Sequence, residues 1–258
     1  MRKVKEEHYS DYLELAKTNP CNTIYPMAIV EGVQHGDIYT DNSEKHQYAL
    51  FWHESGFAYI SGHPEPEDLE EIYVLAINKS GNNSRRFVME LNDEPVEAFF
   101  QGKEDIERTP RYALRLRKLL PYKEIPEGYE LKEIDEDLFS RIEGRVVPRN
   151  FWSSSEEFLT KGKGYCLVKN GEAAAVAFSA ACSSRQIDIG IETREAHRRK
   201  GLAAIAARKM AEYVLSIGKE PVWDCNVTNA GSRATAERVG FEVVSQYAHY
   251  KAKETQRY

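Results

Sequence analysis

The chain has 258 residues, 41% of them hydrophobic, 11% aromatic and 29% charged, with a net charge of −6. This composition predicts a folded globular protein of one large or two modest domains and excludes an intrinsically disordered chain. Since no stretch approaches the ~18 uncharged apolar residues of a membrane span, and no apolar segment follows the charged N-terminus, we expect no membrane protein and no signal peptide.

Charge is distributed unevenly along the chain. Residues 1–125 contain 15 Lys and Arg against 22 Asp and Glu, whereas residues 126–258 contain 20 against 19. The acidic first half argues against a nucleic-acid-binding protein, which would show a basic surface. The four cysteines form no C-x-x-C pair and have no metal-ligand spacing with histidine, so we expect reduced thiols, no bound metal and a cytoplasmic location.

The first half is predicted to contain both helices and strands. The predicted helices cover 8–17, 67–76 and 109–120, and the predicted strands cover 36–42, 48–52, 57–60 and 87–91. Helix 109–120 is expected to be amphipathic and basic. Two prolines, a glycine and several charges between 121 and 128 are typical of a linker, which predicts domains at 1–122 and 123–258.

The second half begins a new pattern after this linker. Strands are predicted at 129–132, 164–169, 173–181, 185–193, 221–227 and 241–251, and helices at 135–142, 156–160, 202–217 and 230–239. Asn170-Gly171 between two apolar runs indicates a hairpin. Gly218 and Gly240 follow two of the helices, where glycine commonly ends a helix.

One strand–loop–helix segment has the features of an anion site. Along strand 185–193, Ile187, Ile189 and Ile191 face one way, and Asp188, Gly190 and Glu192 face the other. The helix that follows begins with Arg198-x-x-Gly201-x-Ala203, beside Arg199 and Lys200. Because the first N–H groups of a helix have no internal partner and small residues admit a ligand, this segment predicts a pyrophosphate cradle.

Arg198-x-x-Gly201-x-Ala203 resembles the acetyl-CoA signature [QR]-x-x-G-x-[GA] of the GNAT N-acetyltransferase superfamily. The strand Val222–Val227, the Asn229-x-x-Ser232 helix start and the closing Gly240-Phe241 resemble the second GNAT signature. The resemblance covers about residues 126–258. Trp223-Asp224-Cys225 and segment 36–42 also resemble a two-domain bacterial GNAT subgroup, which extends the likeness over the whole chain.

The resemblance implies an α+β protein. Its C-terminal part would have the GNAT fold, a mixed and splayed central sheet flanked by helices, behind an N-terminal α/β domain. The implied ligand is acetyl-CoA, wedged between the splayed strands, with Gly190 suited to its close approach. The implied contacts are the strand Ile191, Glu192 and Thr193 for pantetheine and thioester, the loop Arg198, Arg199, Lys200, Gly201, Leu202 and Ala203 for pyrophosphate, and Asn229 and Ser232 for pantetheine or phosphate.

The implied activity is acetyl transfer from acetyl-CoA to a primary amine of a small molecule, by direct attack in a ternary complex. Such an amine is mostly protonated at neutral pH, so the reaction needs a base, for which Asp188 and Glu192 are the candidates. Many GNAT enzymes carry a tyrosine in the last helix as the acid for the thiolate. Ala236 stands there, which leaves Tyr247, Tyr250, Cys225 or water. The alternative is a non-catalytic acyl-CoA-binding module that serves as a sensor or scaffold.

The role of the acidic residues 1–122 stays open. They would form a degenerate GNAT-like half, a substrate lid or the surface of a homodimer. Their negative charge could also attract a cationic amine acceptor. We expect no nucleic-acid partner.

Overall fold

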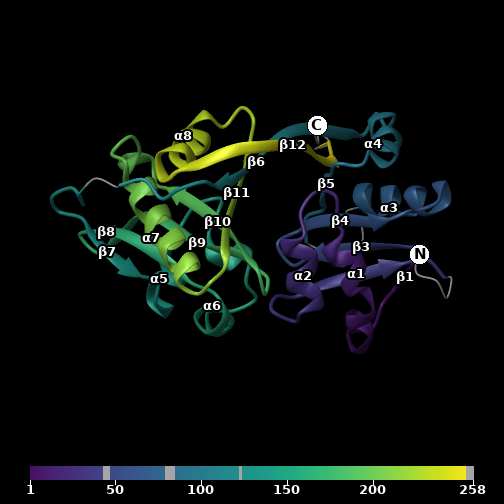
Figure 1. Cartoon of the computed structure of the whole chain (residues 1–258), viewed down its shortest axis with the longest axis horizontal. Helices are drawn as coiled ribbons and strands as arrows, with labels where there is room; N and C mark the ends of the chain where they lie inside the picture. Colours follow the sequence, from purple (N-terminus) through teal and green to yellow (C-terminus); the bar gives the residue numbers. More distant parts are fainter. Residues whose placement is uncertain (43–46, 79–84, 122–123, 254–258) are drawn as a thin grey trace, which may run out of the picture. The chain divides into compact units, whose positions relative to one another are not determined.

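The computed structural model describes residues 1–42, 47–78, 85–121 and 124–253 (Figure 1). The chain forms two compact units, the first made of Met1–Arg111 together with the chain from Gln246 onward, and the second of Tyr112–Ser245. This division differs from domains at 1–122 and 123–258, because the last strand region groups with the N-terminal part. Residues 122–123, where the domain boundary was predicted, lie outside the described residues, so the boundary stays a prediction.

The first unit contains a mixed sheet and its helices. Its elements are β1 (Arg2–Lys3), the 3-10 helix η1 (Glu6–Tyr12), α1 (Leu13–Lys17), α2 (Ile24–Val30), β2 (Gly36–Thr40), β3 (Tyr48–His53), β4 (Phe57–Gly62), α3 (Pro66–Ile77), β5 (Val88–Leu91), α4 (Glu94–Gln101), and parts of β6 (Ile106–Leu116) and β12 (Phe241–Ala252). Strands β1 to β4 pair antiparallel in chain order, β4 pairs parallel with β5, and β5 pairs antiparallel with β12.

The second unit contains the other parts of β6 and β12 and a second mixed sheet region. Its further elements are β7 (Glu130–Glu133), α5 (Glu136–Arg141), η2 (Pro148–Asn150), α6 (Ser155–Lys161), β8 (Gly164–Lys169), β9 (Glu172–Cys182), β10 (Gln186–Thr193), η3 (Glu195–His197), α7 (Leu202–Ser216), β11 (Glu220–Asn226) and α8 (Ala230–Val239). Strands β7 to β10 pair antiparallel in chain order, and β10 pairs parallel with β11.

The two units share one order of elements. Each has a strand, a helical segment, three further antiparallel strands, a helix, a parallel strand, a helix and a last strand. The expected α+β class, with a mixed sheet flanked by helices, is therefore confirmed. Of the three roles left open for the N-terminal region, the shared order supports a GNAT-like half.

Most predicted elements lie within a few residues of the observed ones, but the basic helix at 109–120 was wrong. This segment belongs to strand β6. Its pattern has a period of two, because basic side chains at 111, 115 and 117 alternate with Tyr112, Leu114 and Leu116. Pro110 also disfavours a helical conformation of the residue before it. Helices α2 and α4 were not predicted.

The sheet of the first unit is buried on both faces. One face packs apolar side chains of the sheet, such as Leu50 and Trp52, against Leu69 and Ile72 of α3 and Phe100 of α4. On α2, the ring of Tyr25 stacks on Tyr59 at 5.4 Å and meets the edge of His53 at 5.0 Å. Buried polar groups on these strands include Glu90, whose carboxylate lies 2.7 Å from His249 Nε2.

His53 is fully buried at the end of β3, and its Nδ1 accepts the backbone N–H of Ser55 at 3.1 Å. Burial, with a smaller contribution from the nearby charge of Arg85, lowers the pKa of His53 to about 3. The imidazole of the folded protein is therefore neutral at neutral pH.

Acidification from pH 7 to pH 5 should destabilise the first unit. The unfolded chain protonates His53 near its ordinary pKa of about 6.5 while the folded chain does not, which costs about 2 kcal/mol at pH 5. His53→Asn keeps an acceptor for Ser55 N–H and removes the titration, so its stability should depend less on pH. Urea unfolding of both proteins at the two pH values measures this, and equal pH dependence would contradict it.

Candidate functional site

The central strands of the second unit separate part-way along their length. β10 and β11 pair in parallel only from Gln186↔Glu220 to Asp188↔Val222. Beyond that point β10 continues to Thr193 along β9, and β11 continues to Asn226. The strand edges that face each other past Asp188 and Val222 thus have no ladder between them, which leaves backbone donors and acceptors for another partner.

A β-bulge accompanies this separation. The β9–β10 register shifts between Asp188 and Ile189, because Asp188 pairs with Ala181 and Ile189 with Ser179, so Ala180 is the extra residue of β9. Such a bulge bends and twists its strand locally. The bulge lies at the residue where β10 stops pairing with β11, and we attribute the separation to it.

The loop after β10 has a backbone conformation that leaves the start of α7 accessible to an anion. Two residues in the left-handed region flank Lys200: Arg199 at φ 63° and Gly201 at φ 80°. Gly201 is the N-cap of the 15-residue α7, and no side chain caps that end. A Cβ on Gly201 would meet no atom within 4 Å, so there is open space beside the N-terminal end of α7, where the helix dipole favours an anion.

The corresponding helix of the first unit, α3, begins differently. Pro66 stands in its first turn, Asp68 accepts the backbone N–H of Glu65 at 3.1 Å, and Glu67 adds a further negative charge. These carboxylates occupy the end of the helix that an anion would need. Among the described residues, the anion-binding features of this helix position therefore belong to the second unit.

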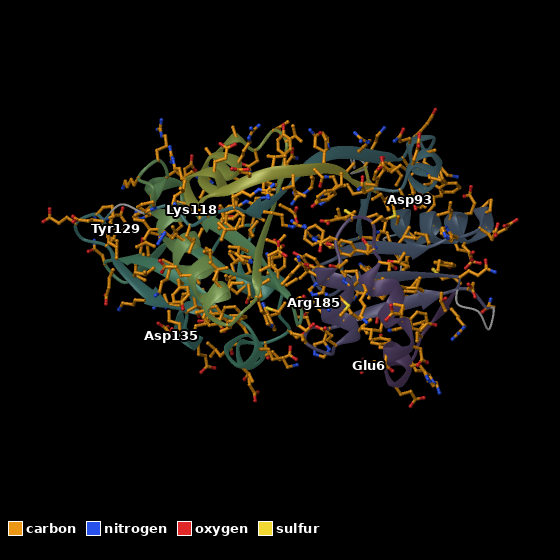
Figure 2. The ribbon with its side chains drawn as sticks, in the orientation of Figure 1. Glu6, Asp93, Lys118, Tyr129, Asp135 and Arg185 are labelled. Carbon is orange, nitrogen blue, oxygen red and sulfur yellow. The ribbon has the colours of Figure 1, made fainter. Side chains whose placement is uncertain are left out.

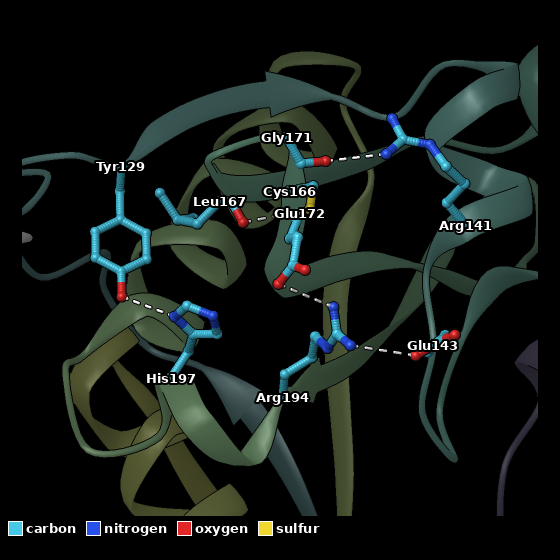
Figure 3. Close-up of polar contacts among 9 residues, drawn as sticks. All are labelled: Tyr129, Arg141, Glu143, Cys166, Leu167, Gly171, Glu172, Arg194 and His197. Atoms are coloured by element: carbon cyan, nitrogen blue, oxygen red, sulfur yellow. Dashed lines mark hydrogen bonds and ion pairs between the residues drawn. The ribbon is translucent and has the colours of Figure 1, made fainter.

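Side chains from other parts of the second unit make polar contacts with the loop between β10 and α7 (Figure 3). The hydroxyl of Tyr129 lies 2.8 Å from His197 Nδ1 and accepts from Lys200 Nζ at 3.1 Å. Arg194 forms ion pairs with Glu143 at 3.3 Å and Glu172 at 3.4 Å. Arg198, Arg199 and Lys200 are exposed, so the loop carries positive charge at its surface.

Glu192 anchors a neighbouring loop. Its Oε2 accepts the backbone N–H groups of Arg145 at 3.0 Å and Val146 at 3.1 Å, and its Oε1 accepts that of Thr193 at 3.1 Å. Gly144, at φ 144°, packs so closely that a Cβ there would lie 2.5 Å from Glu192 Cγ. The predicted base is thus also the residue that ties the 144–146 segment to the end of β10.

Asp188 and Glu192 lie on the same face of β10, on either side of Gly190. Gly190 stands between them, and a Cβ there would lie 2.7 Å from the ring of Phe178, its partner on β9. The space beside Gly190 is therefore filled by Phe178 rather than left for a ligand on that face. Asp188 is 8% exposed and lies in the last parallel pair before the opening.

The predicted contacts at the start of α8, Asn229 and Ser232, have structural partners of their own. Asn229 caps α8 by accepting the N–H of Ser232 at 3.0 Å. Ser232 Oγ in turn accepts the indole N–H of Trp223, a fully buried residue of β11, at 3.1 Å. This chain of contacts fixes the start of α8 beside the end of β11.

Several residues at the site were missed by the sequence analysis. Tyr129, Gly144, Phe178 and Arg194 act through contacts with residues far along the chain. Only Gly144, as a glycine in a charged segment, gave any local signal.

Comparison with known proteins identifies the family. The profile described as GNAT acetyltransferase matches residues 14–250. The chain belongs to the GNAT acetyltransferase family. The GNAT signatures and the splayed strands at the site agree with this assignment, and enzymes of the family use acetyl-CoA for acetyl transfer.

Individual relatives cover the whole chain. The "Uncharacterized N-acetyltransferase YdfB" of Bacillus subtilis is 23% identical over 256 residues, which is 97% of this chain and 98% of that protein. A GCN5-related N-acetyltransferase-like protein from Streptococcus suis has a TM-score of 0.75 at 24% identity, over 96% of this chain and 99% of that one. A tandem GNAT protein from the clavulanic acid biosynthesis pathway has a TM-score of 0.61 at 14% identity, over 96% and 94%. Both structural likenesses concern the fold.

The residues where β10 and β11 separate fit acetyl-CoA. The edges of β10 and β11 that do not pair with each other offer backbone groups to an extended amide chain, and the left-handed turn at Gly201 leaves space for phosphate at the start of α7. No helix among the described residues is long and apolar enough to cross a membrane.

The position of the usual GNAT tyrosine is occupied by a buried residue, Ala236 of α8. Of the proposed substitutes, Tyr247 and Tyr250 belong to the first unit, where their hydroxyls accept from Arg111 and Arg108 respectively. Cys225 is in the second unit and is 3% exposed. The acid therefore stays unassigned.

Gly201→Glu should weaken acetyl-CoA binding by at least about 30-fold, because it forces a side chain into a left-handed position and directs negative charge at the phosphates. Gly218→Glu is the matched control. Gly218 also has a positive φ, 73°, and open space around its Cβ, but follows the other end of α7. Isothermal titration of both variants tests this, and equal losses of affinity would contradict the assigned position.

Proposed function

We propose that this protein is an acetyl-CoA-dependent N-acetyltransferase that acetylates the primary amine of a small molecule in a ternary complex. The observation that carries the proposal is the opening between β10 and β11 beside an uncapped helix start. The acidic excess of residues 1–125 favours a cationic acceptor.

Acetyl-CoA supplies an acetyl thioester when it is bound. The N–H groups of residues 199–203 bind its pyrophosphate, and the open edge of β10 past Asp188 provides backbone donors near the thioester carbonyl. A carboxylate removes a proton from the ammonium group of the acceptor, directly or through water. The free amine then forms the N–C bond as the C–S bond breaks, and the thiolate leaves as the thiol after taking up a proton.

The two candidate carboxylates are suited to different tasks. Glu192 already accepts three backbone N–H groups, so its part is to hold the 144–146 segment beside the reacting end of β10. Asp188 lies at the residue where the opening begins. We therefore propose Asp188 as the base and Glu192 as the anchor of the 144–146 segment.

A non-catalytic acyl-CoA-binding module is the second candidate. The observation in its favour is Ala236, which is fully buried where many GNAT enzymes place a tyrosine acid. Such a module would bind acetyl-CoA as a sensor or scaffold without turnover.

The deciding experiment measures thiol release from acetyl-CoA with a panel of small primary amines, beside calorimetric binding of acetyl-CoA. Amine-dependent release supports the enzyme. Binding without release for every amine supports the module, and absence of binding contradicts both.

Variants of the two carboxylates should separate their roles. Asp188→Asn should lower kcat by about 100-fold or more, because it removes the base. Glu192→Gln should mainly raise KM for the amine, since an amide cannot accept all three N–H groups and the loop loosens. Steady-state kinetics over a range of pH measures both, and a larger loss of kcat in Glu192→Gln would reverse the assignment.

A further inference from the structure

We propose that Tyr129 is a positioning residue for the phosphate loop, defined as residues 194–201, and that its hydroxyl sets the affinity for acetyl-CoA. This inference rests on the proposed function. Tyr129, labelled in Figure 2, lies just before β7 and far from the loop in sequence, yet its hydroxyl contacts two loop residues, His197 and Lys200.

Tyr129 is itself held firmly on the sheet side. Its backbone N–H donates to Pro126 O at 3.1 Å, and the next residue, Glu130, pairs with Val168 of β8. Its ring lies 4.9 Å from Lys169 Nζ and meets the ring of His197 edge to face at 5.7 Å. These contacts fix the ring of Tyr129 with its hydroxyl directed toward the loop.

The hydroxyl of Tyr129 makes one hydrogen bond with Lys200 and one with His197. Lys200 Nζ is a donor only, so the phenol oxygen accepts from it. The phenol O–H donates to His197 Nδ1 when the imidazole carries its proton on Nε2. Desolvation and the nearby charge of Lys200 lower the pKa of His197, which favours the neutral imidazole. Lys200 also donates to Ala196 O at 3.3 Å, which links the middle of the loop to its end.

The loop needs such support because of its backbone. Lys200 stands between Arg199 and Gly201, both in the left-handed region, and Arg199 is not a glycine. A residue in this conformation persists only when its surroundings determine it. The side-chain contact of the neighbouring Arg198, from its Nε to Thr193 O at 3.2 Å, is exposed. Holding the Lys200 side chain thus holds both left-handed residues, and with them the first N–H groups of α7.

Tyr129→Phe is a clean test, because the ring keeps its contacts with Lys169 and His197 and only the hydroxyl is lost. We expect Kd and KM for acetyl-CoA to rise about tenfold with kcat changed less than about twofold. Tyr213→Phe is the matched control: it removes a hydroxyl from α7, in the same unit, that makes no described contact with the loop. Its Kd and melting temperature should match the wild type.

The second experiment combines Tyr129→Phe with Lys200→Met in a double variant. If Tyr129 acts through Lys200, the double variant should bind acetyl-CoA no more weakly than about the weaker single variant, whereas additive losses would contradict the linkage. An unchanged Kd in Tyr129→Phe, or a fall in kcat equal to the rise in KM, overturns the inference while the proposed function stands. A wild type that binds no acetyl-CoA overturns both.

Discussion

The ladder between β10 and β11 ends at Asp188 and Val222, and the rest of the site depends on that ending. A parallel pair inside a sheet ordinarily continues for the length of its strands, because an unpaired buried edge is costly. Here the bulge at Ala180 bends β9 at the same level, so β10 follows β9 away from β11. A partner that supplies backbone-like hydrogen bonds compensates the cost of the open edges, which is why an extended amide-bearing ligand suits the opening.

The second constraint is electrostatic, and it distinguishes two units that share one order of elements. In the second unit, glycine at the N-cap of α7 leaves the positive end of the helix dipole free, with arginines and a lysine around it. In the first unit, the same helix position is closed by proline and by the carboxylates of Glu65 and Asp68. One topology can therefore carry a ligand site in one copy and purely structural packing in the other, according to the few residues at a helix start.

The sequence was informative where function depends on local chemistry. Alternation along β10, the small residues at the start of α7 and the cap at Asn229 are all read within a short window. The basic, amphipathic character of segment 109–120 predicted a helix where β6 lies, although its side chains alternate with a period of two and Pro110 disfavours a helix. The sequence could not identify the bulge at Ala180, the packing of Phe178 against Gly190, or the contact of Tyr129 with His197 and Lys200. These depend on strand register and on residues brought together over long sequence separations.

The pairing of β5 with the end of β12 has a consequence for how the protein is made. Glu90 is buried early in the chain, and His249, opposite it on β12, is synthesised about 160 residues later. Until residues 246–252 leave the ribosome, the first unit lacks a strand, and the carboxylate of Glu90 lacks its neighbour. The first unit therefore cannot complete its fold before the whole of the second unit, Tyr112–Ser245, has been synthesised.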